Sequence, residues 1–160
     1  MADELLVIAD AVVFELNQSG RWSVPFVAER KYLPETEFEN FLAGQMHVTV
    51  LARGRNRTSA SRGSSQVEYA IPVLFQQKLA ANTDAAIAPS IEDQCDALMT
   101  FVQEVADWFD VGQGVPLTQY ETAKFLASSN DPAYDQASLE ENMLFTSVLV
   151  LGFRTWRAKR

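Results

Sequence analysis

Four arginines within ten positions form the densest group of chemically specific side chains in this sequence. The segment RGRNRTSASRGSS, residues 53–65, contains Arg53, Arg55, Arg57 and Arg62 and no acidic residue. Guanidinium groups form paired hydrogen bonds with carboxylates and phosphates, and they stack on aromatic rings. Three interpretations follow: the segment binds a carboxylate-bearing protein surface, it binds nucleic acid, or it is only a soluble hairpin tip.

The charge balance of the whole chain favours a protein partner. The 160 residues include 13 lysines and arginines against 21 aspartates and glutamates, which gives a formal net charge of −8. Such a body repels phosphate, whereas the arginines of one copy suit the carboxylates of the next. A head-to-tail contact of this kind closes into a ring when the rotation allows it. The sequence therefore predicts self-assembly, with nucleic-acid binding through the arginine-rich loop as an alternative.

A second basic group lies near the end of the sequence and surrounds a tryptophan. The indole ring is expected to be half exposed at the end of the last strand. We expect a further partner contact there, through Arg154, Trp156, Arg157, Lys159 and Arg160.

Side chains suited to catalysis are scarce. His47 is the only histidine and lies in a predicted strand, and Cys95 is the only cysteine and lies on the apolar stripe of a predicted helix. These two residues cannot make a zinc site of the common kinds, and the glycine patterns of phosphate-binding loops are absent from the sequence. The carboxylates of ETEFE, residues 35–39, and those around Glu92 look like solvated faces. We therefore expect no catalysis, no metal and no cofactor; a hydrolase with paired carboxylates is the enzymatic alternative.

Hydrophobic periodicity indicates the elements that must position these residues. Apolar residues recur every three to four positions in two stretches, which predicts amphipathic helices over residues 3–17 and 88–112. Alternating apolar residues predict strands over 45–53 and 66–78, near Val24, Phe26 and Ala28, and from Lys124. Residues 143–156 are almost continuously apolar, as in a central strand buried on both faces. We predict a single α+β domain over residues 1–160, with about five strands packed against two main helices.

The arginine-rich segment lies between two of the predicted strands. The sequence therefore predicts a β-hairpin with a long flexible loop at about 53–65, whereas most hairpin loops have about two to five residues. Each arm of such a loop could reach about 20 Å beyond the sheet, far enough to touch a neighbouring subunit. The last four residues, 157–160, are expected to form a basic tail.

The sequence gives no sign of export or of membrane insertion. Its first residues, MADELLVIAD, carry acids where a secretory signal needs positive charge. No apolar stretch approaches the length of about 18 residues that a membrane span requires. With a single cysteine the chain cannot form an internal disulfide, so we expect a soluble protein of a reducing cytoplasm.

Several phrases of the sequence resemble a known family. VPFVAERKYLP, VTVLARGRNRTSASRG, YAIPVLFQQKL, VADWF and FTSVLVLGFR follow one another in this order. Together they are similar to small proteins from the morphogenesis modules of tailed phages and prophages. The resemblance extends over residues 5–155 and points to the tail-completion or tail-terminator class, the head–tail joining proteins of long-tailed phages.

This resemblance implies a structural protein of the virion without catalysis. A hexameric ring of such a protein caps the tail tube and joins it to the head–tail connector, in virions assembled in the bacterial cytoplasm. DNA passes through the ring without specific binding, and no membrane takes part. Long hairpin loops of the family contact neighbouring subunits and the adjoining ring. A head-side adaptor or stopper of the same junction is the alternative within this class, and the matching loop positions here are Arg53, Arg55, Arg57 and Arg62.

Overall fold

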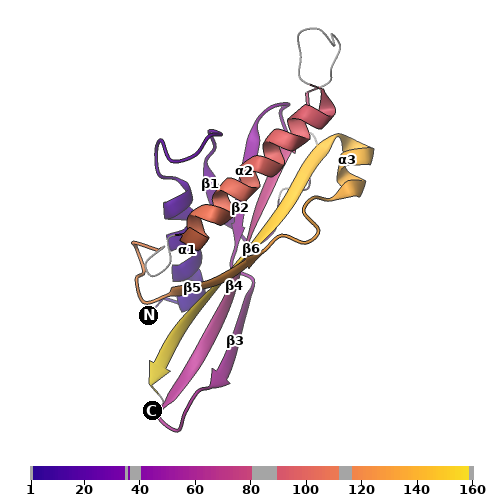
Figure 1. Cartoon of the computed structure of the whole chain (residues 1–160). Coiled ribbons are helices and arrows are strands. Elements are labelled where there is room, and N and C mark those ends of the chain that lie inside the picture. The colour runs from indigo at the N-terminus through magenta and orange to yellow at the C-terminus, as the bar shows by residue number, and fades with distance from the viewer. Residues whose placement is uncertain (1, 35, 37–40, 81–89, 112–116, 159–160) are drawn as a thin grey trace.

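Two helices cover one face of a mixed β-sheet, and one end of the sheet extends past them as a narrow arm (Figure 1). The computed structural model describes residues 2–34, 36, 41–80, 90–111 and 117–158. The described residues form one α+β domain with six strands and three helices. The predicted fold class is confirmed, with one strand and one short helix more than the sequence indicates.

Both main helices begin at capping side chains. Helix α1 (Glu4–Leu16) follows Asp3, whose carboxylate accepts a hydrogen bond from a first-turn backbone N–H at 2.9 Å. Helix α2 (Ile91–Val111) follows Ser90, whose hydroxyl accepts from a first-turn N–H at 3.1 Å. These bonds satisfy N–H groups that have no partner inside the helix. The two predicted helices are therefore confirmed.

Six strands form the sheet: β1 (Ala28–Lys31), β2 (Met46–Leu51), β3 (Gly54–Ser59), β4 (Ser64–Lys78), β5 (Lys124–Ser129) and β6 (Leu144–Ala158). The main order is β1-β2-β4-β6-β5, and β3 pairs with β4 beyond the end of β2. Strand β1 is parallel to β2, and the other pairs are antiparallel. The two longest strands, β4 and β6, pair along their whole length.

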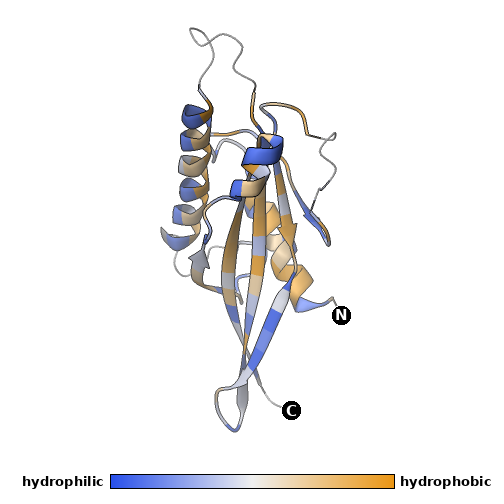
Figure 2. Ribbon diagram, turned by 90° about the vertical axis from the view of Figure 1, so that its right-hand side faces the viewer, coloured by the Kyte–Doolittle hydropathy of each residue, from blue (hydrophilic) through white to orange (hydrophobic). Residues whose placement is uncertain are grey.

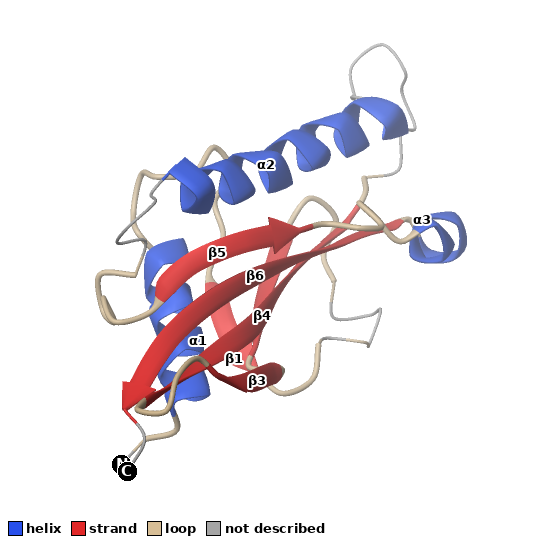
Figure 3. Cartoon of the chain, turned by 60° about the horizontal axis from the view of Figure 1, so that its bottom comes forward, coloured by secondary structure: helices blue, strands red, loops and turns tan. Residues whose placement is uncertain are grey.

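The core lies between the helices and one face of this sheet (Figure 3). Because side chains alternate along a strand, every second residue of β4 and β6 points toward the helices. The fully buried side chains of these positions include Ile71, Val73, Phe75, Leu149, Leu151 and Phe153. Helix α1 packs Ile8 and Val12 against them, and α2 packs Phe101, Val105 and Phe109. Burial of this apolar surface is the main force that holds the helices on the sheet.

The opposite face of the sheet is only partly covered, which corrects the prediction for β6. Val148 and Val150 alternate with the buried core residues of β6 and remain half-buried. Strand β6 is central, between β4 and β5, but it is not buried on both faces. Its run of apolar residues conceals a two-residue alternation that composition alone does not reveal.

The predicted loop at 53–65 is wrong over most of its length. Residues Gly54–Ser59 form strand β3, and only residues 60–63 make the turn between β3 and β4. Glycine and asparagine disfavour a strand on propensity grounds, but pairing with β4 supplies the hydrogen bonds that decide the outcome. Arg55 and Arg57 therefore extend from a paired strand, whereas Arg53 precedes it and Arg62 lies in the turn.

Two smaller differences concern the segments around prolines. The strand predicted near Val24 begins only at Ala28, after Pro25, which has no N–H to offer a ladder. Phe26 still packs on the core, with its ring centroid 5.6 Å from that of Phe101. After the Asn-Asp-Pro turn, the chain adds helix α3 (Gln136–Asn142), which the sequence analysis does not predict and which Asp135 caps.

Candidate functional site

The arginines lie on a three-stranded arm. We define the β arm as residues 53–70, which include Arg53, β3, the turn at 60–63 and the first part of β4, together with residues 152–158 of β6; its three strands pair continuously in the order β3-β4-β6. The arm extends beyond the helices (Figure 1), and hydrophilic residues dominate β3 (Figure 2). The pairing of β4 with β6 continues without a break from the arm into the core, so the arm is an extension of the sheet.

The arm brings the two basic groups of the sequence together. Glu68 lies opposite Asn56 of β3 on one side and opposite Arg154 of β6 on the other. The guanidinium of Arg154 donates to the Glu68 carboxylate at 3.2 Å. The sequence analysis predicts two separate contacts, but the structure places both groups on the same arm. Two residues of the predicted second contact, Lys159 and Arg160, lie outside the described residues.

Strand alternation divides the basic residues between the two faces of the arm. Arg55 and Arg57 share the face of Tyr69 and Val67, which is the face that α1 covers in the body. Arg157 lies on this face too, opposite Ser65. The opposite face carries Arg154 and Trp156, with the guanidinium 6.0 Å from the centre of the indole ring. Trp156 is 55% exposed, as predicted.

Some arginines already have partners within the chain. Arg55 donates to Asp3 at 2.8 Å, and Arg157 lies 3.1 Å from the carboxylate of Glu4. Both acids belong to the start of α1, so these two ion pairs fasten the arm to the body. Arg53, Arg57 and Arg62 are exposed and form no ion pair with the residues that the structure describes. These three guanidiniums are the ones available to a partner.

Glu4 is the centre of the junction between arm and body. Its Oε1 accepts hydrogen bonds from the hydroxyls of Tyr69 and Thr155, and its Oε2 accepts from Tyr120 at 2.7 Å and faces Arg157. Burial alone would raise the pKa of Glu4, but these hydrogen bonds outweigh it and lower the pKa to about 2. Burial, with the Glu4 carboxylate nearby, raises the pKa of Tyr120 to about 12. The carboxylate is therefore a fixed acceptor at neutral pH.

The sequence analysis does not find this junction. Glu4 looks like an ordinary first-turn acid, and its partners come from β4, from the segment before β5 and from β6. The available signal is weak: Tyr69 and Thr155 are polar residues at positions where the alternation points into the core. A polar atom at such a position requires a hydrogen-bond partner.

A shallow hollow lies on the opposite face, where the arm leaves the body. Gly54, Ala70 and Gly152 stand opposite one another across β3, β4 and β6, and their small side chains leave a cavity of about 370 Å³. A Cβ added to Gly152 would lie 3.3 Å from the backbone oxygen of Ala127, so β5 approaches β6 closely at this point. Leu126 borders the hollow and is 38% exposed.

The edges of the sheet differ in how they are covered. The amide of Asn17 accepts from the N–H of Ala28 at 2.7 Å and donates to its carbonyl at 3.0 Å, so it occupies the outer edge of β1. Beyond the end of β5, Asn130 donates to the carbonyl of Val148 at 2.8 Å. Among the described strands, β3 pairs with β4 alone and β5 pairs with β6 alone.

Helix α2 presents an acidic surface to solvent. Its sequence contains six carboxylates and no lysine or arginine. None of these carboxylates forms an ion pair with a described residue. The body therefore carries uncompensated negative charge, whereas the β arm carries uncompensated positive charge.

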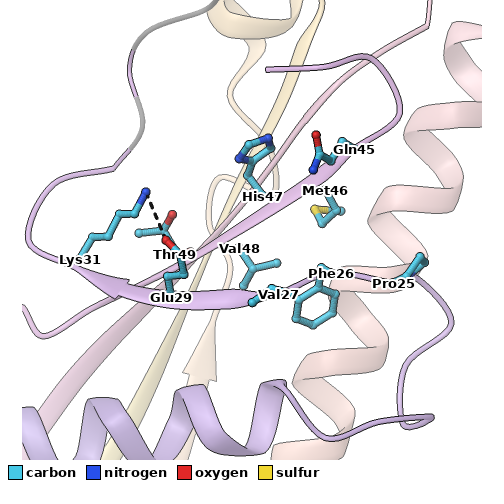
Figure 4. A pocket seen from close by; sticks show the side chains of 10 residues that line it. All are labelled: Pro25, Phe26, Val27, Glu29, Lys31, Gln45, Met46, His47, Val48 and Thr49. Carbon is cyan, nitrogen blue, oxygen red and sulfur yellow. Dashed lines mark ion pairs between the residues drawn. The ribbon is translucent and has the colours of Figure 1, made fainter. Parts of the chain in front are cut away.

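His47 lines a hollow at the β1 edge, a cavity of about 490 Å³ (Figure 4). The ring of Phe41 meets the imidazole edge-on, with centroids 4.8 Å apart. Lys31 and Glu29 form an ion pair at 3.6 Å along the same hollow. The Nε2 atom of His47 is buried and has no hydrogen-bond partner among the described residues. The imidazole thus packs on an aromatic ring, and no described nucleophile or carboxylate is bonded to it.

Other features of chemical interest are limited. Burial, and then the nearby Asp96 and Glu92, raise the pKa of the half-buried Cys95 thiol, which keeps it protonated. Among the described residues, no three or more acids, cysteines and histidines gather where they could hold a metal ion. No described helix has the length and apolar character needed to cross a membrane.

Comparison with known proteins adds no identification. No family model matches the chain, and no curated protein matches it either.

Proposed function

We propose that the chain is a structural subunit of a phage head–tail junction, a tail terminator that forms a ring on the tail tube and joins it to the connector on the head side. The observation that carries this proposal is the β arm. It collects Arg53, Arg55, Arg57, Arg62, Arg154 and Arg157 on a stiff extension of an otherwise acidic body. A head-to-tail contact between such subunits pairs opposite charges at every interface.

The sequence resemblance supports the same proposal. The phrases that resemble tail terminators include most of β2, the whole of β3, residues 69–78 of β4 and residues 145–154 of β6. These are the strands that build the arm and connect it to the core. The resemblance and the charge distribution therefore point to the same part of the molecule.

Electron microscopy of particles made without this protein tests the proposal. Filled heads beside unattached tails of irregular length are the expected result, because a terminator fixes the end of the tail tube. Unattached tails of normal length beside heads that leak DNA would instead place the protein on the head side, as an adaptor or stopper. Intact, infectious virions would contradict both assignments.

A further inference from the structure

Strand β3 forms a regular edge of the sheet along the arm (Figure 1). Among the described strands it pairs with β4 alone, through six consecutive residues without a bulge. The other two described edge strands are protected. The amide of Asn17 bonds to the backbone of Ala28 in β1, and a bulge between Phe125 and Ala127 interrupts the register of β5. A regular edge strand without such protection is suited to bind a further strand.

The hydrogen bonds at the turn identify which residues of β3 direct their backbone outward. The N–H of Ala60 donates to the carbonyl of Ser64 at 3.3 Å, and from this pair the residues that bond to β4 alternate along β3. The even-numbered residues of β3 therefore direct their N–H and C=O groups toward β4. The odd-numbered residues, among them Arg55 and Arg57, direct theirs away from β4, toward the position of an added strand.

The arginines determine which kind of strand this edge accepts. Arg53 and Arg57 are exposed and form no ion pair with a described residue, whereas Arg55 between them is already paired with Asp3 at 2.8 Å. A strand added to this edge places its side chains directly opposite these positions. A matching strand therefore carries carboxylates opposite Arg53 and Arg57, four residues apart, and an uncharged residue opposite Arg55.

The same charges exclude a second copy of β3 as the added strand. Because the residues that point outward are arginines, two copies of β3 would pair with arginine opposite arginine, and like charges directly opposite each other are destabilising. The other described edge strands do not supply the carboxylates either. Strand β5 contains no acid, and in β1 Glu29 is followed by Arg30 and Lys31. No described edge strand of this chain therefore matches the pattern.

We propose that the outer edge of β3 binds an extended acidic segment of a different protein as an antiparallel strand. The backbone groups of Arg55 and Arg57 form the ladder bonds. The guanidiniums of Arg53 and Arg57 bind two carboxylates of the segment that lie four residues apart, and their paired hydrogen bonds fix the register. The antiparallel direction is chosen because its pairing is the more stable per residue.

This site goes beyond the ring contact proposed above and does not depend on it. A guanidinium has five N–H donors, and one carboxylate occupies two of them when it binds with both oxygens. Arg53 and Arg57 therefore keep donors for a neighbouring subunit while they hold the added strand. The arm thus has a binding site for a second kind of protein.

Peptide binding to the intact protein tests this site. The probe is the fluorescent peptide SEVTVES, whose two glutamates lie on one face of an extended strand with the threonine between them. The control peptide, SEVTEVS, has the same composition, but its glutamates point to opposite faces. We expect the probe to bind at least about tenfold more tightly than the control in an anisotropy titration, because only the probe meets both guanidiniums. Equal affinities, or no binding of the probe at about 1 mM protein, would overturn the proposal.

Methylation of single peptide nitrogens separates ladder bonding from charge attraction. In the proposed register, the threonine N–H of the probe donates to the backbone carbonyl of Arg55, whereas the N–H groups of its valines point to solvent. N-methylation of the threonine should therefore weaken binding by about tenfold, and N-methylation of the second valine should change it by less than about threefold. The two modified peptides have the same charge and the same composition. Equal effects of the two methyl groups would mean that the segment does not bind as a strand, which would overturn the proposal.

Two arginine substitutions provide a matched comparison within the arm. Arg57→Gln and Arg62→Gln each remove one exposed guanidinium that has no ion pair with a described residue, but Arg62 lies in the turn beyond the strand. Arg57→Gln should weaken binding of the probe by about tenfold, whereas Arg62→Gln should change it by less than about threefold. Equal losses would mean that net charge, and not the edge of β3, attracts the peptide. Circular dichroism confirms in each case that the variant is folded.

Ring formation and tail joining report on the proposed function separately. Rings of the wild-type protein that do not bind the probe would overturn the edge site but leave the terminator proposal intact. Selective binding of the probe by a protein whose absence leaves virions intact and infectious would have the opposite meaning. It would support the edge site and contradict the terminator proposal.

Discussion

At the scale of single residues, Glu4 shows how this fold retains a charge beside its core. The carboxylate is 12% exposed, and three hydroxyls and one guanidinium surround it. A buried charge is costly unless every lone pair has a partner, and here the partners come from three separate segments. Removing the charge therefore eliminates the ion pair with Arg157. It also weakens the hydrogen bonds that attach α1 to the arm.

Glu4→Gln should destabilise the protein, by about 3 kcal/mol at most, since the pKa of Glu4 falls from 4.5 to about 2 on folding. Because the folded-state pKa is the lower one, this stability is fully present above pH 4.5. It is lost as the pH falls from about 4.5 to about 2. Urea unfolding of the wild type and the variant at pH 7 and at pH 3 measures the difference. A gap between the two proteins that does not shrink at pH 3 would contradict the role given to this carboxylate.

At the scale of elements, the sequence predicts the helices and long strands well because their periodicity arises from the core. The stripe of Leu98, Val102 and Phe109 on α2 and the alternation of Ile71 and Phe75 on β4 both reflect burial against the same surface. Strand β3 has no such signal. Its side chains face solvent on both sides of the arm, and its backbone pairing with β4 is a tertiary effect.

The candidate site could be predicted only in part for the same reason. The arginines stand out by type, and the exposure of Trp156 follows from its place at a strand end. The sequence cannot show that β4 places Glu68 between Asn56 and Arg154, or that Arg55 pairs with Asp3. These contacts depend on strand register over long separations, which local patterns do not encode.

Substitutions of exposed arginines in the arm should affect assembly and leave folding almost unchanged. Replacing Arg53, Arg57 and Arg62 with alanine removes no ion pair between described residues, so the free energy of unfolding should change by less than about 1 kcal/mol. Ring formation, measured by sedimentation velocity, should be lost, since these guanidiniums are the free ones. A matched variant with Lys31, Lys78 and Lys124 replaced by alanine has the same net charge and should still assemble. Normal assembly of the arginine variant would contradict the assignment of the arm.

At the scale of the whole molecule, charge is separated between an acidic body and a basic arm. The net charge of −8 coexists with six arginines on the β arm, and the carboxylates of α2 have no cationic partner among described residues. On the proposal made above, the arm of one copy pairs with the acidic body of the next, whereas phosphate is repelled by most of the surface.

The isolated protein should therefore not bind duplex DNA in a gel-shift measurement at about 50 mM salt. Contacts to phosphate are strong at this low salt concentration, so any DNA binding would be detected there. Its self-association should weaken as salt is added, because charge pairs at an exposed interface are screened. Binding to DNA that falls by about 3.6 in log K per decade of salt would instead indicate about four phosphate contacts. That result would favour a nucleic-acid-binding role for the arm.

The unbroken course of β4 and β6 has a mechanical consequence. Each strand has 15 residues, paired from beneath the helices to the end of the arm, and such a pair spans about 50 Å. The ladder bonds lie across the strands, so a pull along the arm loads many of them together in shear. Because the pairing is continuous, the arm should not bend independently of the core. A displacement of its tip should therefore rotate the helix-covered body as well.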